Sequence, residues 1–174
     1  MQSKINQYYY AGGQKIPLHR VDHLVALRGQ IPSKTSPAKK LASKKGWSMP
    51  LMNGLSLVDL GGIADEDLAK FASPGDMQPV YTSGNTIMVP LPEVSVEAVD
   101  AGKRKSLQVL LDKMGGLARV ETGKYGQMTV YLTSGKGDDA LQLANLIHEK
   151  IRPEVASPRF MQVTSSPDVM RPLK

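Results

Sequence analysis

The segment from Met128 to Thr133 constrains the fold most tightly, because its apolar and polar residues alternate one by one. Successive side chains of a β-strand point to opposite faces, so one face of this strand is apolar and the other is polar. The two sets are, in turn, Met128, Val130 and Leu132, and Thr129, Tyr131 and Thr133. Such a strand is typical of a sheet that is buried on one face only, and the chain must supply a layer that covers this face.

Two helical segments can supply this layer. Between Lys103 and Met114, apolar residues recur at positions i, i+3, i+4 and i+7, which predicts a helix with one buried stripe. Gly115 and Gly116 end it through the left-handed conformation that glycine permits. A second helix opens at Asp138–Asp139 and ends before Pro153. The two stripes consist of Leu107, Leu110, Leu111 and Met114, and of Ala140, Leu143, Ala144, Ile147 and Ile151.

Four extended segments surround these helices, so the order from Ile87 onward is β-α-β-β-α-β. This order predicts an α+β fold of the ferredoxin-like kind, in which two helices cover one face of a four-stranded antiparallel sheet. Right-handed crossovers then give the spatial strand order 4-1-3-2. The predicted strands span residues 87–99, 117–122, 127–133 and 155–163.

The N-terminal part has a different character. The run from Tyr8 to Leu18 predicts two short strands around a turn at Gly12–Gly13, since tyrosine favours strands and glycine supplies the positive φ of a tight turn. His23–Arg28 predicts another strand and Asp65–Ala72 a short helix. We therefore expect three parts: an N-terminal β-hairpin region with a basic loop (1–75), the ferredoxin-like domain (76–163) and a C-terminal tail (164–174).

The positive charge of the chain is concentrated in one segment. The formal net charge is +6, and no Asp or Glu lies between Asp22 and Asp59. Because acidic and basic residues balance in the remainder, the whole excess belongs to Arg28, Lys34, Lys39, Lys40, Lys44 and Lys45. The segment 30–50 is also rich in Pro and Ser, which favours a solvated connecting loop. The alternative is a basic patch that binds nucleic acid or an acidic partner.

Several kinds of chemistry lack their residues in this sequence. The chain has no cysteine, which excludes disulfides, thiolate nucleophiles and Cys-bound metals. The three histidines are scattered, and neither a phosphate-binding loop nor a nucleophile elbow occurs. An acylphosphatase-like enzyme would need an arginine-bearing phosphate loop, for which Asp100–Arg104 is a poor substitute. We therefore expect no enzyme, no metal and no cofactor.

The sequence also bears on partners and localisation. A ferredoxin-like sheet can bind RNA through stacking aromatics on its two central strands, but here these strands carry only Tyr131, so nucleic acid is an unlikely partner of the sheet. No apolar run of about 18 residues occurs, so we expect no membrane span. The N-terminus lacks the apolar stretch of a secretory signal, which favours a cytoplasmic protein unless the chain is part of a longer, secreted precursor.

The C-terminal third resembles a known family. Ala140–Asn145, followed by Pro153–Phe160, is similar to the end of the propeptides of subtilisin-like serine proteases, where a helix of the type Ala-Leu-x-x-Ala-Asn precedes a strand reading roughly Val-Glu-x-Ala-x-Pro-Asn-aromatic. Tyr8–Leu18 also resembles the opening of a bacterial subgroup of subtilase precursors. Ser157 and Arg159 depart from the acidic residue and the Asn that are common in the family. The catalytic motifs of the protease itself are absent.

This resemblance implies an inhibitor and intramolecular chaperone that holds a protease as a zymogen. In the family, the open face of the sheet packs on the catalytic domain, in cis or in trans, and the C-terminal segment occupies the substrate cleft as a product-like strand. The implied contact residues are Glu121, Thr129, Tyr131, Thr133, Glu154, Phe160, Val163, Thr164, Ser165, Ser166 and Pro167. The two glutamates would cap helices of the protease. Solvated glutamates and a frayed tail remain the alternatives.

Overall fold

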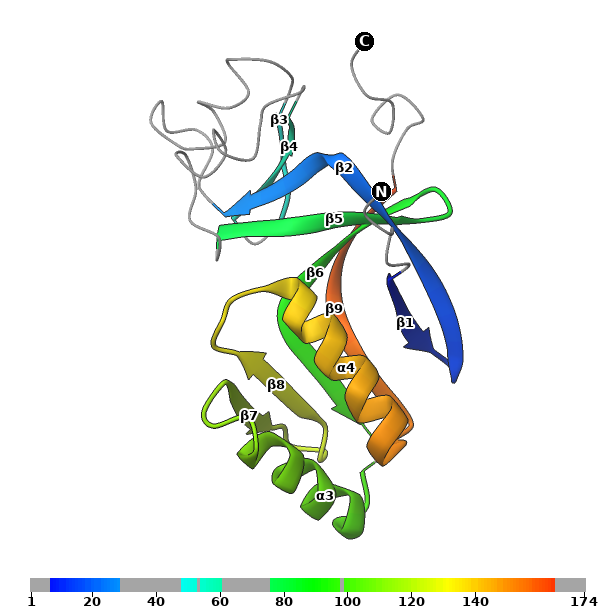
Figure 1. Ribbon diagram of the computed structural model, residues 1–174, viewed down its shortest axis with the longest axis vertical. Helices are drawn as coiled ribbons and strands as arrows, with labels where there is room; N and C mark the ends of the chain where they lie inside the picture. Colours follow the sequence, from blue (N-terminus) through cyan, green and yellow to red (C-terminus); the bar gives the residue numbers. More distant parts are fainter. Residues whose placement is uncertain (1–6, 29–47, 53, 61–75, 98, 165–174) are drawn as a thin grey trace, which may run out of the picture. The chain divides into compact units, whose positions relative to one another are not determined.

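The computed structural model describes residues 7–28, 48–52, 54–60, 76–97 and 99–164 (Figure 1). Within these residues the protein combines a nine-stranded antiparallel sheet with two helices, so the expectation of a mixed α and β fold is confirmed. The sheet is larger than the four strands predicted from Ile87 onward, because the N-terminal strands join it. The predicted helix 65–72 and most of the basic segment lie outside the described residues.

The strands follow one another in the order β3-β4-β2-β5-β6-β8-β7, with β1 paired to β2 and β9 to β6. Along the chain, the first six strands precede both helices; α3 lies between β6 and β7, and α4 lies between β8 and β9. The elements are β1 (Gln7–Ala11), β2 (Gln14–Arg28), β3 (Ser48–Pro50), β4 (Leu55–Asp59), β5 (Met77–Ser83), β6 (Thr86–Glu97), α3 (Ala101–Asp112), β7 (Ala118–Thr122), β8 (Met128–Leu132), α4 (Gly137–Ile151) and β9 (Val155–Thr164).

The chain divides into two compact units. Unit 1 consists of Met1–His19 and Pro90–Phe160, and unit 2 of Arg20–Val89 and Met161–Lys174. The boundaries fall inside β2, β6 and β9, whereas the sequence placed them near residues 75 and 163. The sequence left open whether residues 1–75 form a separate domain.

Unit 1 contains the strand whose alternation opened the sequence analysis. Both helices pack on the apolar face of β8 and β6, and the side chains of this layer form one core. Antiparallel register places Val130 of β8 between Val94 of β6 and Val120 of β7. The strand and helix residues buried in this core are Val94, Val96, Val99, Leu107, Leu111, Met128, Val130, Leu132, Ala140, Leu143, Ala144, Ile147, Ile151 and Ala156. The predicted one-sided burial of β8 is therefore confirmed.

Helix α3 begins two residues earlier than predicted, because Asp100 caps it. The Asp100 carboxylate accepts a hydrogen bond from the backbone N–H of Lys103 at 2.8 Å, which satisfies a donor that the first turn leaves unpaired. At its other end, α3 stops at Asp112, two residues before the predicted end at Met114, and the C-cap residue Lys113 is right-handed. Gly115 and Gly116, with φ of 60° and 84°, adopt the predicted left-handed conformation in the turn that follows the helix.

Replacing Asp100 by Ala removes this cap, and we expect the free energy of unfolding to fall by about 1 kcal/mol. Urea denaturation followed by circular dichroism measures the change. The matched control is Asp112→Ala at the opposite end of the same helix, where a negative charge has no favourable interaction with the helix dipole and the carboxylate accepts only a solvent-exposed hydrogen bond from the Gln108 amide at 2.7 Å. An Asp100→Ala variant as stable as the Asp112→Ala variant would contradict the capping role.

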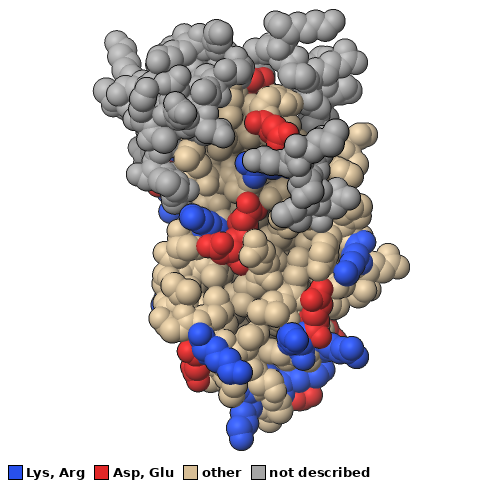
Figure 2. Space-filling model, viewed as in Figure 1, with Lys and Arg blue, Asp and Glu red and all other residues tan. Residues whose placement is uncertain are grey.

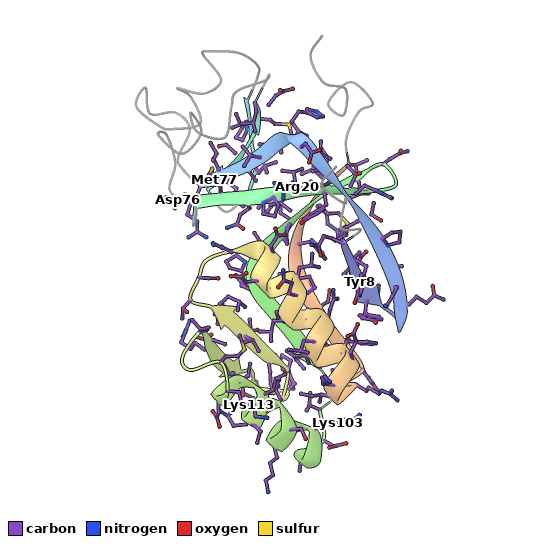
Figure 3. The ribbon with its side chains drawn as sticks, in the orientation of Figure 1. Tyr8, Arg20, Asp76, Met77, Lys103 and Lys113 are labelled. Atoms are coloured by element: carbon purple, nitrogen blue, oxygen red, sulfur yellow. The ribbon has the colours of Figure 1, made fainter. Side chains whose placement is uncertain are left out.

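The N-terminal hairpin is attached to α4 by its tyrosines. The hydroxyls of Tyr8 and Tyr10 donate to the Glu149 carboxylate at 2.8 and 3.0 Å, and the Asn145 amide donates to the backbone carbonyl of Tyr8 at 2.8 Å. Tyr8 is labelled on β1 in Figure 3. The ring of Tyr10 also stacks on His148, with centroids 3.8 Å apart. These contacts explain why residues 7–19 belong to the same unit as the helices.

This cluster makes stability depend on pH. The two hydroxyls hold the pKa of Glu149 below its ordinary value, so the folded state favours the carboxylate. The stabilisation is therefore present above the pKa of the unfolded chain, about 4.3, and is lost as the pH falls through the lower folded value. We expect Glu149→Gln to reduce the loss of stability between neutral and acidic pH, measured as the urea midpoint at each pH. A double Tyr8→Phe, Tyr10→Phe variant should act in the same way, and an unchanged pH dependence in both would contradict this account.

Most of the described residues of unit 2 lie in β-strands. Here β4 pairs with β2 and β3 with β4, and the hairpin β5–β6 turns at Gly84. All five residues of β4 are buried, which fits a central strand with side chains covered on both faces. The largest fully buried side chains in this unit are Leu24, Leu27, Leu57, Val58, Val80 and Ile87, with Gln78 among them.

Candidate functional site: the open face of the sheet

The face of β6, β7 and β8 opposite the helices is the candidate site. In unit 1, the strands follow the order β9-β6-β8-β7, and α3 and α4 occupy one side of them. Side chains that alternate with the core residues point to the other side, and within the described part of unit 1 no helix packs on it. We call this surface the open face; it carries Glu93, Ser95, Arg119, Glu121, Thr129, Tyr131 and Arg159.

Strand register aligns these side chains in two rows across the sheet. In one row, Tyr131 lies directly between Glu93 of β6 and Arg119 of β7. In the other row, Thr129 lies between Ser95 and Glu121. Directly opposite residues have their Cβ atoms close enough for the side chains to interact. The sheet therefore holds a fixed array of an aromatic ring, hydroxyls and charges.

The charges of the open face are paired with one another. The Arg119 guanidinium lies over the Tyr131 ring, 4.7 Å from its centroid, and also forms an ion pair with Glu121. Arg159 of β9 donates to Glu93 at 3.0 Å. Two arginines and two glutamates thus neutralise each other, so this face has no excess charge that would attract a polyanion.

Tyr131 is the half-buried centre of this array. Desolvation raises the pKa of its phenol, and the neighbouring carboxylates of Glu121 and then Glu93 raise it further, while Arg119 lowers it. The hydroxyl therefore stays protonated over the whole neutral range and can donate a hydrogen bond to a partner.

The structure brings three of the predicted contact residues together on the open face: Glu121, Thr129 and Tyr131. Thr133 follows β8 and is exposed; its hydroxyl donates to the backbone carbonyl of Leu117 at 3.2 Å. Glu154 is exposed elsewhere in unit 1, where it lines a cavity of about 210 Å³ with the Gly12–Gly13 turn. Phe160 packs edge-to-face on Tyr9, with centroids 5.0 Å apart.

The remaining predicted residues belong to unit 2 or lie outside the description. Val163 is half-buried and Thr164 is exposed at the end of β9. Ser165, Ser166 and Pro167 lie outside the described residues, as do Lys34, Lys39, Lys40, Lys44 and Lys45. Arg28 is exposed at the last position of β2. The role of the basic segment in binding an acidic partner therefore stays a prediction.

Four residues of the open face were not among the predicted contact residues: Glu93, Ser95, Arg119 and Arg159. Alternation alone could have placed each of them, because Glu93 precedes the buried Val94, and Arg159 follows the buried Pro158. Arg119 could not have been matched to Tyr131 in this way, since their pairing depends on the register between β7 and β8.

Other kinds of site were considered for the described residues: metal sites and membrane-spanning helices. Among the described residues, no group of three or more His, Asp or Glu could hold a metal ion. No described helix has the length and apolar character needed to cross a membrane. Comparison of the chain with models of known families, with curated proteins and with solved structures gives no match.

The electrostatics of the open face can be measured at Tyr131. Replacing Glu121 by Gln removes a negative charge beside the phenol, so the pKa of Tyr131 is expected to shift down toward its ordinary value. Nuclear magnetic resonance of tyrosines labelled with ¹³C at the ζ carbon follows this titration, and Tyr131→Phe assigns the signal among the six tyrosines. If Glu121→Gln left the pKa of Tyr131 unchanged or raised it, the arrangement of the open face would be contradicted.

Proposed function

We propose that this protein is a propeptide-like inhibitor and folding chaperone of a subtilisin-like serine protease. The observation that carries this proposal is a β-α-β-β-α-β unit with strand order 4-1-3-2, on whose second face no described helix of unit 1 packs. The elements β6, α3, β7, β8, α4 and β9 follow one another in this order, and the strands lie side by side as β9-β6-β8-β7. We assign this part of unit 1 to the ferredoxin-like class. Because that class hosts many functions, the proposal also rests on the motifs that resemble the propeptide family.

In the proposed complex, the open face docks on the catalytic domain. Its centre offers an aromatic ring and a guanidinium, the side chains that most often dominate protein interfaces. Around them, Glu121, which pairs with Arg119, and the ion pair of Arg159 with Glu93 form a polar rim. Arg159 stands where Asn is common in the family, and in the proposed complex it would be part of the binding surface. The chain would bind the protease either in cis, as part of the same precursor, or in trans, as a separate protein.

The C-terminal segment would enter the substrate cleft. Strand β9 continues to Thr164, and the tail follows it directly. An extended segment adds backbone hydrogen bonds at the edge of a cleft, and alternate side chains fill its pockets. Docking of the open face would keep this segment at a high effective concentration near the cleft. The tail alone would then bind more weakly than the whole chain.

The test is inhibition of a panel of purified subtilisins by the intact chain. We expect tight inhibition of at least one, because both contacts are available at once. Thr129→Arg places a bulky charge at the centre of the open face and should weaken this inhibition by about 30-fold or more. The matched control is Gln142→Arg, an exposed position of α4 on the helical side, which should leave inhibition unchanged.

Truncation separates the two contacts. A chain that ends at Val163 keeps the open face and should bind with reduced inhibition, measured by the same titration. The proposal fails if neither the intact chain nor the shortened one inhibits or binds any protease of the panel. It also fails if Thr129→Arg and Gln142→Arg inhibit equally well.

A further inference from the structure

A second pocket of unit 1 lies between the start of α3 and the turn that joins β7 to β8. Its volume is about 450 Å³, within the range of small-molecule sites. The lining combines an apolar wall, an exposed aromatic ring, a guanidinium, an amide and a carboxylate. These groups belong to Val99, Tyr125, Arg104, Gln127 and Glu97, with Gly126 completing the wall. Glu97 follows Ser95 on the same side of β6, beyond the two rows of the open face, and the other lining residues lie outside that face.

The turn that carries the aromatic ring is held in one conformation. The backbone N–H of Gly123 donates to the Gln127 carbonyl at 2.7 Å, and that of Gly126 donates to the Gly123 carbonyl at 3.1 Å. The side-chain oxygen of Gln127 accepts from the N–H of Tyr125 at 3.1 Å. The ring of Tyr125 is nevertheless 85% exposed, whereas most large aromatics bury their area. An aromatic side chain displayed on a rigid turn is prepared for stacking on a planar ligand.

The guanidinium is placed by the same turn. Gly126 has a φ of 82°, and a Cβ built on it would lie only 2.9 Å from an Nη atom of Arg104. The absence of a side chain at residue 126 therefore lets Arg104 lie against the backbone of the turn. The ammonium of Lys124 lies 5.6 Å from the Tyr125 ring, so a second cation is available next to it. Figure 2 shows Lys and Arg side chains gathered at the end of unit 1 that carries α3.

We propose that this pocket binds a nucleoside monophosphate. The base would stack on Tyr125, and the phosphate would form charge-assisted hydrogen bonds with Arg104, supported by Lys124. The Glu97 carboxylate accepts hydrogen bonds and would take the sugar hydroxyls, while the Gln127 amide offers donors. A free inorganic phosphate would use the guanidinium alone and leave the ring and the carboxylate unoccupied. This inference is independent of the protease-binding function, since it uses other residues.

Isothermal titration calorimetry of the full chain with AMP and with GMP tests the proposal. We expect saturable binding of at least one nucleotide, and weaker binding of adenosine, ribose 5-phosphate and inorganic phosphate, which each lack at least one of the groups recognised. Arg104→Gln should weaken nucleotide binding by about tenfold or more through loss of the charge-assisted bonds. Tyr125→Ala should weaken it by a similar factor through loss of stacking.

Lys105→Gln is the matched control, because it removes one positive charge from the same turn of α3 at a position that does not line the pocket. It should change the affinity by less than about twofold, since an exposed charge outside the site contributes little. Unchanged thermal unfolding shows that each variant is folded. The proposal is overturned if neither nucleotide binds, if inorganic phosphate binds as tightly as AMP, if phosphotyrosine binds and the nucleotides do not, or if Lys105→Gln and Arg104→Gln weaken binding equally.

Discussion

The packing of two helices on one face of β6 and β8 is the interaction on which unit 1 depends. Val94, Val96 and Val130 are fully buried beneath the helices. Each fully buried aliphatic side chain contributes about 1.5–3 kcal/mol relative to an exposed one, so this layer dominates the favourable free energy of the unit. Because the side chains of a strand alternate, burial of one set forces the other set onto the opposite face. The open face is therefore a direct consequence of the core.

A second, polar interaction ties the N-terminus to this core. The Glu149 carboxylate accepts hydrogen bonds from the hydroxyls of Tyr8 and Tyr10, and the ammonium of Lys15 lies 4.3 Å from the centroid of the Tyr8 ring. Charge-assisted bonds to a carboxylate are stronger than those between neutral groups, although solvent weakens them at an exposed position. The hairpin thus adds to unit 1 through specific side chains, and the helices and β1 belong to one cooperative structure.

Local patterns predicted much of unit 1. The alternation from Met128 to Thr133, the stripe of α4 and the glycine pair after α3 each depend on neighbours in the sequence, and each is found in the structure. The hairpin at Gly12–Gly13 was predicted for the same reason. The patterns could not reveal that β1 to β5 would join the sheet, since pairing between distant strands depends on tertiary packing.

The candidate site was predictable only in part. Thr129 and Tyr131 follow from the alternation, whereas Arg119 reaches the ring of Tyr131 through a register that no local pattern defines. The pocket at Arg104 could not be predicted from the sequence, where Gly123–Gly126 predicts only a turn. Its lining depends on the close approach of Gly126 to a side chain of α3. The net charge of +6 likewise says little about either surface, because the basic segment from Arg28 to Lys45 accounts for it.

In the proposed complex, the open face of unit 1 contacts the catalytic domain of the protease. Hydroxyl-radical footprinting tests this contact most directly. The oxidation rates of two tyrosines of unit 1 are compared in the free protein and in its complex with a subtilisin that it inhibits. The catalytic serine of this subtilisin is replaced by alanine. Tyr131 lies at the centre of the open face, and Tyr125 is exposed on the β7–β8 turn. The account predicts that the protease lowers the oxidation rate of Tyr131 and leaves that of Tyr125 unchanged. Oxidation of Tyr131 at the rate of the free protein, in a complex that has formed, would contradict it.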